Sequence, residues 1–304
     1  MATTQKSQTN GVKGHANGVT TTSFTRFAHI PPAIDIPVRG GDIEDEAVNL
    51  DLTDLGVDNI DELCDLLENE NVARNFWVTI ALAYAKEKKV DTAIDIVRKG
   101  LDALKGPQLE DRTMLYSCLS WLQLSKARHA PRVRPENSTD EVNIKDYWMQ
   151  AATATLNEAS KLNPANPSLA LARGVLNLLS AALQTGRSAA TATGALAEAA
   201  KCFEITLRAS KNQNVMALMG KAKAIYSLGK YTEALQLYQQ SLEKAPHLLN
   251  PDPRIGIGCC LWQLGHKEHA RSAWERSLEL NPQSSIAHTP VSYTHLTLPT
   301  NREV

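Results

Sequence analysis

Residues 229–246 read GKYTEALQLYQQSLEKAP, and residues 265–282, thirty-six positions later, read GHKEHARSAWERSLELNP. Glycine, alanine, an aromatic residue, Ser-Leu-Glu and proline recur at matching places, while most residues between them differ. A skeleton that returns at a fixed period is typical of repeat proteins, in which each copy is one structural unit that packs on the next. The two stretches therefore predict an array of such units.

Earlier stretches of the chain fit the same skeleton. The tetratricopeptide pattern is a helix–turn–helix of about 34 residues with the signature W-x2-L-G-x2-Y, A-x3-F and P. The first copy fills these slots with Trp77, Ile80, Ala81 and Tyr84, followed by Ala93 in the second helix. Five copies are predicted, near 74–107, 112–165, 167–213, 215–248 and 251–284. The predicted fold is an all-α, right-handed tetratricopeptide-repeat (TPR) solenoid of about five helix–turn–helix repeats.

The recurring slots have steric reasons. Small residues at Ala81, Ala222 and Gly258 let the first helix of a repeat approach the second closely. Gly229 and Gly265 supply the backbone freedom that the turn between the helices needs. A proline follows the second helix in four of the five copies, at Pro107, Pro164, Pro246 and Pro282, because its ring blocks a continued helix. The residues that differ between copies are then free to face solvent or a ligand.

Two repeats have connectors longer than the consensus turn: about twenty extra residues lie in KARHAPRVRPENSTDEVNI and about eight around RSAATATG. The first connector is basic, with Lys126, Arg128, His129, Arg132 and Arg134. It has no aromatic residue for base stacking, so direct sequence-specific nucleic-acid binding is not predicted. A solvated insertion and a partner contact both stay open for it.

The chain before the repeats divides into two parts. Residues 1–27 are rich in Thr, Ser, Asn and Gly, and we expect a disordered tail. Residues 28–73 are expected to form an extended strap, an acidic collar and a short helix, in that order. The strap is the stretch FAHIPPAIDIPVRGG, whose prolines exclude a helix. Between positions 42 and 70 stand twelve acidic residues and no Lys or Arg. This collar either solvates the first helices or docks a basic partner.

The TPR array is predicted to cover residues 74–285. Residues 286–304 contain HTPVSYTHLTLPTNREV, which has no helical period and does not suit the polar capping helix that ends a solenoid. We expect this segment to be a non-native tail.

Composition narrows the class further. Hydrophobic residues make up 43% of the chain but aromatic residues only 5%, which favours close-packed Ala- and Leu-rich helices. The sequence has no stretch apolar enough to span a membrane and no signal peptide. The five cysteines form no C-x-x-C pair and are interpreted as small buried hydrophobes of a reducing compartment, the cytosol or the nucleus.

Signatures of catalysis are missing from the sequence. It has no G-x-x-x-x-G-K-[ST] phosphate loop and no G-x-G-x-x-G after a strand. His266 and His269 are three residues apart, but no further ligand stands in register with them, so exposed histidines are favoured over a metal site. We predict no enzyme activity, no cofactor and no metal.

The first helix of each TPR repeat lines the concave face, at repeat positions two, five, nine and twelve. These positions form a mostly apolar, Met-containing lining that suits an apolar or amphipathic peptide. The predicted partner-binding residues are Val78, Leu82, Tyr116, Leu171, Val175, Leu178, Met216, Met219, Tyr226, Ile255 and Trp262. The alternative is that some of them only pack against neighbouring repeats.

Chaperone-binding TPR modules are a rival class, because they hold a C-terminal carboxylate with Lys, Arg and Asn. Position nine would need Asn, but here it is Leu82, Val175, Lys223 and Cys259. A co-chaperone role is therefore not predicted.

The stretches IDIPV, FWVTIALAYAKEKKVDTAIDIV and YWMQAATATLNEASKLNP, with the acidic segment and the long connector, carry a more specific likeness. Over residues 24–285 the chain resembles the N-terminal part of the large TPR subunit of the RNA polymerase II-associated factor complex. The resemblance implies a nuclear scaffold without catalysis that binds the founding subunit of that complex and parafibromin. It also implies indirect contact with RNA polymerase II and chromatin, and support of elongation and histone modification.

Two other classes stay open. One is a generic TPR peptide-binding adaptor outside transcription, and the other is the regulatory part of a longer enzyme.

Overall fold

The structure is a computed structural model that describes residues 29–38, 47–55, 60–104, 109–133, 144–184 and 189–290. The predicted disordered tail at 1–27 lies outside these residues, as do Arg134 and positions 291–304.

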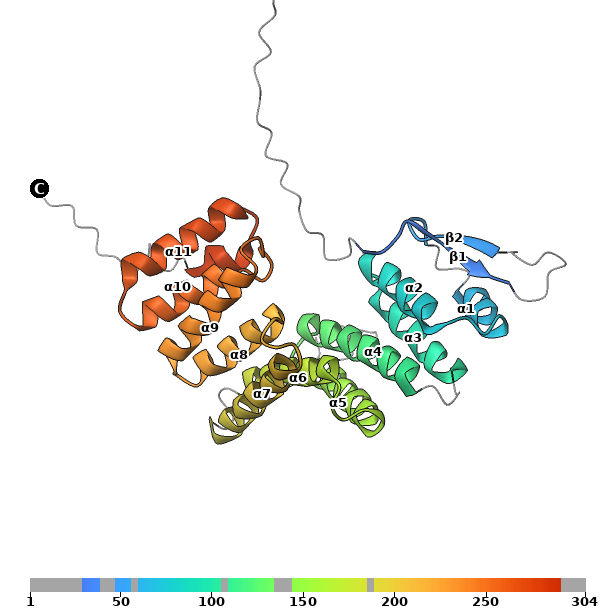
Figure 1. The fold of residues 1–304 in the computed structure, drawn as a ribbon, viewed down its shortest axis with the longest axis horizontal. Helices are drawn as coiled ribbons and strands as arrows, with labels where there is room; N and C mark the ends of the chain where they lie inside the picture. The colour runs from blue at the N-terminus through green and yellow to red at the C-terminus, as the bar shows by residue number, and fades with distance from the viewer. Residues whose placement is uncertain are drawn as a thin grey trace, which may run out of the picture.

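Five helix pairs follow one another along the chain, at the places that the repeats predict. The pairs are α2 (Arg74–Lys86) with α3 (Val90–Ala103), α4 (Leu109–His129) with α5 (Lys145–Leu162), α6 (Pro167–Gln184) with α7 (Ala189–Ala209), α8 (Val215–Ser227) with α9 (Tyr231–Lys244), and α10 (Pro253–Gln263) with α11 (Lys267–Leu280). Figure 1 shows them stacked into an arc whose first and last pairs stand on opposite sides. The predicted TPR solenoid is confirmed.

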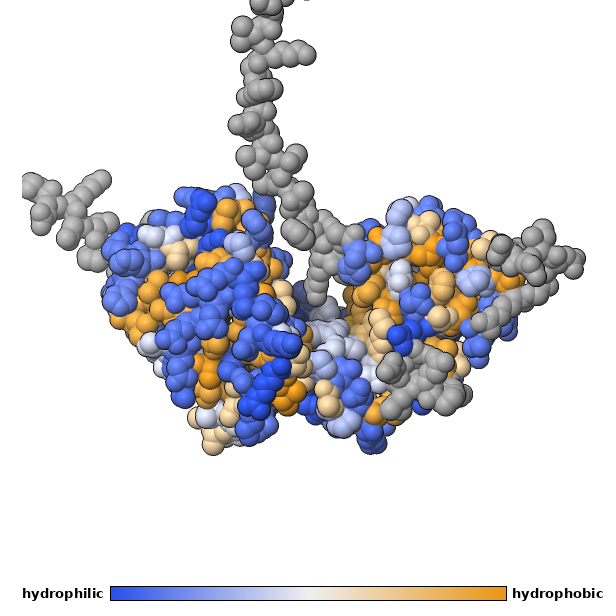
Figure 2. Space-filling model, in the orientation of Figure 1, coloured by the Kyte–Doolittle hydropathy of each residue, from blue (hydrophilic) through white to orange (hydrophobic). Residues whose placement is uncertain are grey.

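The arc encloses a hollow on the face seen in Figure 2, and hydrophobic residues lie on both of its flanks. Two tight turns use the predicted glycines, since Gly229 has a φ of 81° and Gly265 a φ of 89°. Only glycine takes such angles without strain, so these turns fix the angle between the helices of the last two pairs.

The segment before the array is extended, as expected, but it forms a β-hairpin rather than a lone strap. Strand β1 (Ala33–Pro37) pairs antiparallel with β2 (Ala47–Asp51), in a register that sets Ile36 opposite Val48. The sequence pattern does not predict the second strand, because AVNLD lies inside the acidic collar and its charge favours solvent. Ile36 is fully buried, and α1 (Ile60–Asn69) follows the hairpin.

Both long connectors are shorter than the sequence suggests, because the helices beside them are longer. Helix α4 continues to His129, so Lys126 and Arg128 lie on a helix and not in a loop. Helix α7 starts at Ala189, so most of RSAATATG is helical. The alanines and threonines of that stretch are compatible with a helix, and the packing of α6 against α7 selects it.

The core is divided along the array rather than gathered at one centre. A first hydrophobic cluster runs from the hairpin to α6, a second surrounds Phe203, and a third surrounds Tyr238 and Cys260. This follows from the repeat architecture, in which each unit packs mainly on its neighbours.

Helical backbone also continues past the expected end of the array. Residues 285–290 are helical, and Ala287 is fully buried. The boundary predicted at 285 therefore does not coincide with the end of helical structure. That residues 286–304 are a non-native tail stays a prediction.

Candidate partner-binding groove

The predicted groove residues fall into two groups. Those of the first three repeats are largely taken up by packing: Val78 is buried, and Leu82, Tyr116 and Val175 pack against the first hydrophobic cluster. Leu171 and Leu178 pack against the second cluster, so these positions contribute only part of their surface to the concave face.

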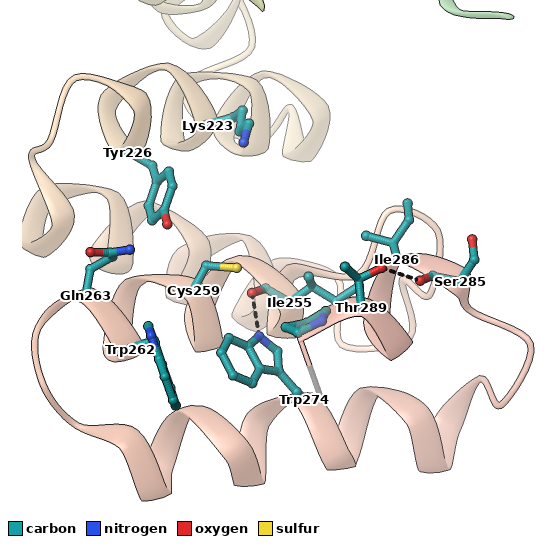
Figure 3. A pocket seen from close by; sticks show the side chains of 11 residues that line it. Lys223, Tyr226, Ile255, Cys259, Trp262, Gln263, Trp274, Ser285, Ile286 and Thr289 are labelled. Carbon is teal, nitrogen blue, oxygen red and sulfur yellow. Dashed lines mark hydrogen bonds between the residues drawn. The ribbon is translucent and has the colours of Figure 1, made fainter. Parts of the chain in front are cut away.

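The other predicted residues, in the last two repeats, are partly exposed too, although Met219 and Tyr226 pack against the third cluster. Met216 is 44% exposed, and Met219, Tyr226, Ile255 and Trp262 are half-buried. Tyr226, Ile255 and Trp262 share one pocket of about 720 Å³ (Figure 3). Its complete lining is Lys223, Tyr226, Ile255, Cys259, Trp262, Gln263, Trp274, Ser285, Ile286, Thr289 and Pro290.

Helices α8 and α10 supply walls of this pocket through their periodicity, and α11 and the helical residues 285–290 complete the lining. On α8, Lys223 and Tyr226 line the pocket and share one face with Met216 and Met219, because these four residues are spaced by three or four positions. On α10, Ile255, Cys259 and Trp262 do the same. Both stripes belong to the first helices of their repeats, which is why one linear pattern could predict most of them.

Caps hold the starts of both helices. The side chain of Asn214 accepts a hydrogen bond from the backbone N–H of Ala217, at 2.9 Å. Asp252, which is buried, accepts from the backbone N–H of Arg254 at 2.9 Å and from the hydroxyl of Ser277 at 2.6 Å. The second contact ties the start of α10 to α11, because Ser277 lies on α11.

Trp274 forms the floor of the pocket from α11. Its indole Nε1–H donates to the backbone oxygen of Ile255 at 3.1 Å (Figure 3). The ring lies so close to Gly258 that a Cβ there would stand 2.2 Å from Nε1. Its centroid is 5.8 Å from that of Trp262, whose ring also faces the ammonium of Lys267 at 5.4 Å. The two indoles thus form a rigid apolar surface.

Among the described residues that line the pocket, Lys223 is the charged one. The ammonium of Lys223 lies 5.4 Å from the centroid of the Tyr226 ring. Burial raises the pKa of the Cys259 thiol, against the opposite effect of Lys223 and of a hydrogen bond from Trp274. Burial also raises the pKa of Tyr226. Thiol and phenol are therefore neutral at physiological pH, so neither adds a negative charge to the pocket.

Sequence reasoning misses Lys223, Cys259, Gln263 and Trp274 as members of one site. It names Lys223 and Cys259 only because they occupy repeat position nine, where a chaperone-binding module would have Asn. It treats Trp274 only as a large residue of the recurring repeat pattern. The signal that could have found the first two is their helical spacing from Met219 and Ile255. Trp274 needs the tertiary structure, since it comes from another helix.

Within the described residues there is no group of three or more His, Cys, Asp or Glu side chains that could hold a metal ion. His266 and His269 lie with ring centroids 6.3 Å apart. Among the same residues, none of the helices has the length and apolarity to cross a membrane.

Two family models described as tetratricopeptide repeat match the chain, over residues 183–248 and 226–289. Solved structures share the fold alone. A TPR protein of Thermus thermophilus is 12% identical with a TM-score of 0.55, and covers 74% of this chain and 100% of its own. A chain of the Cut9–Hcn1 hetero-tetramer of the APC/C is 15% identical with a TM-score of 0.55, over 78% of this chain and 40% of its own.

Curated relatives are more similar in sequence. Tetratricopeptide repeat protein 1 of Schizosaccharomyces pombe is 34% identical, over 88% of this chain and 24% of that protein. RNA polymerase-associated protein CTR9 of Saccharomyces cerevisiae is 31% identical, over 84% of this chain and 22% of that protein. The CTR9 homolog of Arabidopsis thaliana is 29% identical, over 83% of this chain and 21% of that protein.

The fold and the repeat matches make this chain a tetratricopeptide-repeat protein. It spans about a quarter of the length of the curated relatives that it matches. Within the TPR class its homologues are the CTR9 proteins, which it matches over more than four fifths of its own length, as the sequence resemblance indicated.

Proposed function

We propose that this chain is a non-catalytic, nuclear scaffold of the RNA polymerase II-associated factor complex, which binds extended or helical segments of partner subunits on its concave face. Its homology to proteins named RNA polymerase-associated supports the assignment to that complex. The observation that carries the binding role is the groove of α8 and α10, where Met219, Tyr226 and Trp262 stay partly exposed although they are large and apolar.

The proposed partners are the founding subunit of the complex and parafibromin, and RNA polymerase II and chromatin are reached through them. In this role the chain supports transcription elongation and histone modification. Partly exposed aromatic and Met side chains on a helical array are the kind of surface on which a few anchors dominate binding.

Co-expression with the founding subunit and parafibromin, followed by affinity capture and sizing, tests this function. Trp262→Ala and Met219→Asp are expected to weaken capture by about 2 kcal/mol or more each, because central aromatic and Met anchors dominate such interfaces. Circular dichroism should stay helical for both variants.

Gln240→Asp is the matched control, since Gln240 is exposed on α9 and is not among the pocket residues. Capture that is equal for the wild type and both groove variants would contradict binding at this groove. Absence of either partner from the captured material, with a different nuclear or cytosolic protein in its place, would favour an adaptor outside transcription.

A further inference from the structure

The groove has a charge pattern that the proposed function does not use. The stripe on α8 and the stripe on α10 consist of Met, Tyr, Ile, Cys and Trp side chains with one exception, Lys223. In Figure 3 the Lys223 side chain points from α8 toward the space above Cys259, between Tyr226 and Ile255. One cation therefore stands in the middle of an elongated apolar surface.

Two neighbouring lysines are paired with carboxylates, whereas Lys267 faces the ring of Trp262 at 5.4 Å. Lys221, two residues before Lys223, forms an ion pair with Glu204 of α7. Lys230, at the turn to α9, forms one with Glu233 at 3.6 Å. For Lys223 the part of the chain that the structure describes offers the ring of Tyr226 and no carboxylate partner. Its charge is exposed at the groove without neutralisation from the protein.

The walls add no opposing charge. None of the described residues that line the pocket is Asp or Glu, and the Cys259 thiol and Tyr226 phenol stay neutral. A carboxylate that enters would meet the ammonium of Lys223 and no like charge nearby. A cationic side chain would face Lys223 directly, and like charges at short range are unfavourable.

From this charge complementarity we infer that the segment bound at α8 and α10 is an acidic amphipathic helix. Its apolar side chains pack on Met219 and the indole of Trp262, and a carboxylate between them reaches the Nζ of Lys223. The inference rests on the proposed function, because it presumes that a partner segment lies in this groove, and it adds which kind of segment that is. It also explains why a mostly apolar groove tolerates an unpaired lysine.

The test uses the chain as it is and two fluorescein-labelled synthetic peptides. Both are amphipathic helices with Leu at i, i+3, i+4 and i+7, and they differ only in having Glu or Lys at the positions beside the apolar stripe. Fluorescence anisotropy gives the Kd of each peptide. The wild type should bind the Glu peptide about tenfold or more tightly than the Lys peptide.

Lys223→Glu should remove or reverse that preference, whereas Lys230→Glu should leave it within about twofold of wild type. The control changes the net charge by the same amount on the same helical hairpin, so it separates the groove charge from the charge of the whole molecule. Trp262→Ala should weaken both peptides equally, because the indole contacts only the apolar stripe.

Equal binding of the two peptides, a Glu preference that survives Lys223→Glu, or no binding of either peptide would each overturn the inference. These results are distinguishable from failure of the proposed function. If affinity capture of the partner subunits still depends on Trp262, the groove is a binding site and only its acidic specificity is wrong. If capture does not depend on Trp262, the proposed binding of partner subunits at this groove is wrong.

Discussion

Phe203 has tightly defined surroundings in the array. It is fully buried on α7, and Gly174 of α6 and Gly220 of α8 lie against its ring. A Cβ built on Gly174 would stand 2.7 Å from the ring and one on Gly220 would stand 2.5 Å from it. One aromatic side chain therefore joins three helices, and it requires a glycine on two of them. The close contact with Phe203 accounts for the glycine at position 220 inside a helix.

Phe203→Ala is expected to destabilise the array by about 3–5 kcal/mol through the cavity it leaves. Gly220→Ala should destabilise on its own, because its methyl group collides with the ring. In the Phe203→Ala background the same change should cost less, giving a coupling of about 0.5–3 kcal/mol in a double-mutant cycle. Urea unfolding followed by circular dichroism measures all four proteins.

Gly194→Ala is the matched control for that cycle. Gly194 also lies in a helix, but nothing stands within 4 Å of an added Cβ. Replacing it should stabilise the helix by about 1 kcal/mol, since alanine is the better helix former. If Gly220→Ala behaved like Gly194→Ala, contact with Phe203 would not be what restricts position 220.

Among the elements, the β-hairpin depends most on the rest of the molecule. Two-stranded sheets are marginally stable alone in water. Here the hairpin is anchored by Ile36, Leu52 and Leu55, which are buried in the first hydrophobic cluster. The ammonium of Lys89, at the start of α3, donates to the backbone oxygen of Leu55 at 2.6 Å. The hairpin is thus held by side chains of the first repeat.

Ile36→Asp should release the hairpin from the array. Burying an Ile side chain contributes about 1.5–3 kcal/mol, and an unpaired carboxylate cannot take its place. Hydrogen exchange measured by mass spectrometry should become fast in both strands, while α8 to α11 keep their protection. Asp35→Ala is the control, because Asp35 only accepts an exposed hydrogen bond from Asn49 on the other strand. Slow exchange in the Ile36 variant would show that the hairpin does not need this anchor.

At the scale of the whole molecule, the division of the core into three clusters predicts limited cooperativity. Trp77, with 1% exposure, belongs to the first cluster, whereas Trp274, with 3% exposure, packs between α10 and α11 at the other end. Each tryptophan occupies a repeat position that takes a large side chain, Trp77 in the first repeat and Trp274 in the last. In a solenoid, stability is close to a sum of repeat terms and nearest-neighbour interfaces.

Trp77→Ala should therefore increase hydrogen exchange mainly in α2 to α5, and Trp274→Ala mainly in α10 and α11. Each change removes about 3–5 kcal/mol of packing from its own region. The two variants serve as controls for each other, because each leaves the other end intact. A uniform increase of exchange along the array in both variants would mean that the five repeats unfold as one unit.

The concave positions are similarly buried along the whole array. Leu82, Tyr116 and Val175 are half-buried and pack against the first cluster, and Tyr226 is half-buried and packs against the third. What distinguishes the last two repeats is that Tyr226 and Trp262 also line a pocket.

The sequence by itself determined the repeat fold, the five helix pairs and the helix faces on which three of the pocket residues lie. Ala81, Gly229 and Gly265 stand at fixed spacings because close helix packing and tight turns act between residues near in the chain. Tyr226, Ile255 and Trp262 could be predicted for the same reason, since a helix places such positions on one face.

Only the tertiary structure decided the rest. The pairing of β1 with β2 joins two short segments whose separate patterns are weak, and burial of Ile36 against the first repeat makes them a hairpin. Lys223, Cys259 and Trp274 form one pocket because α8, α10 and α11 pack together. Contacts between different helices depend on how the repeats stack, and no spacing along a single helix encodes that geometry.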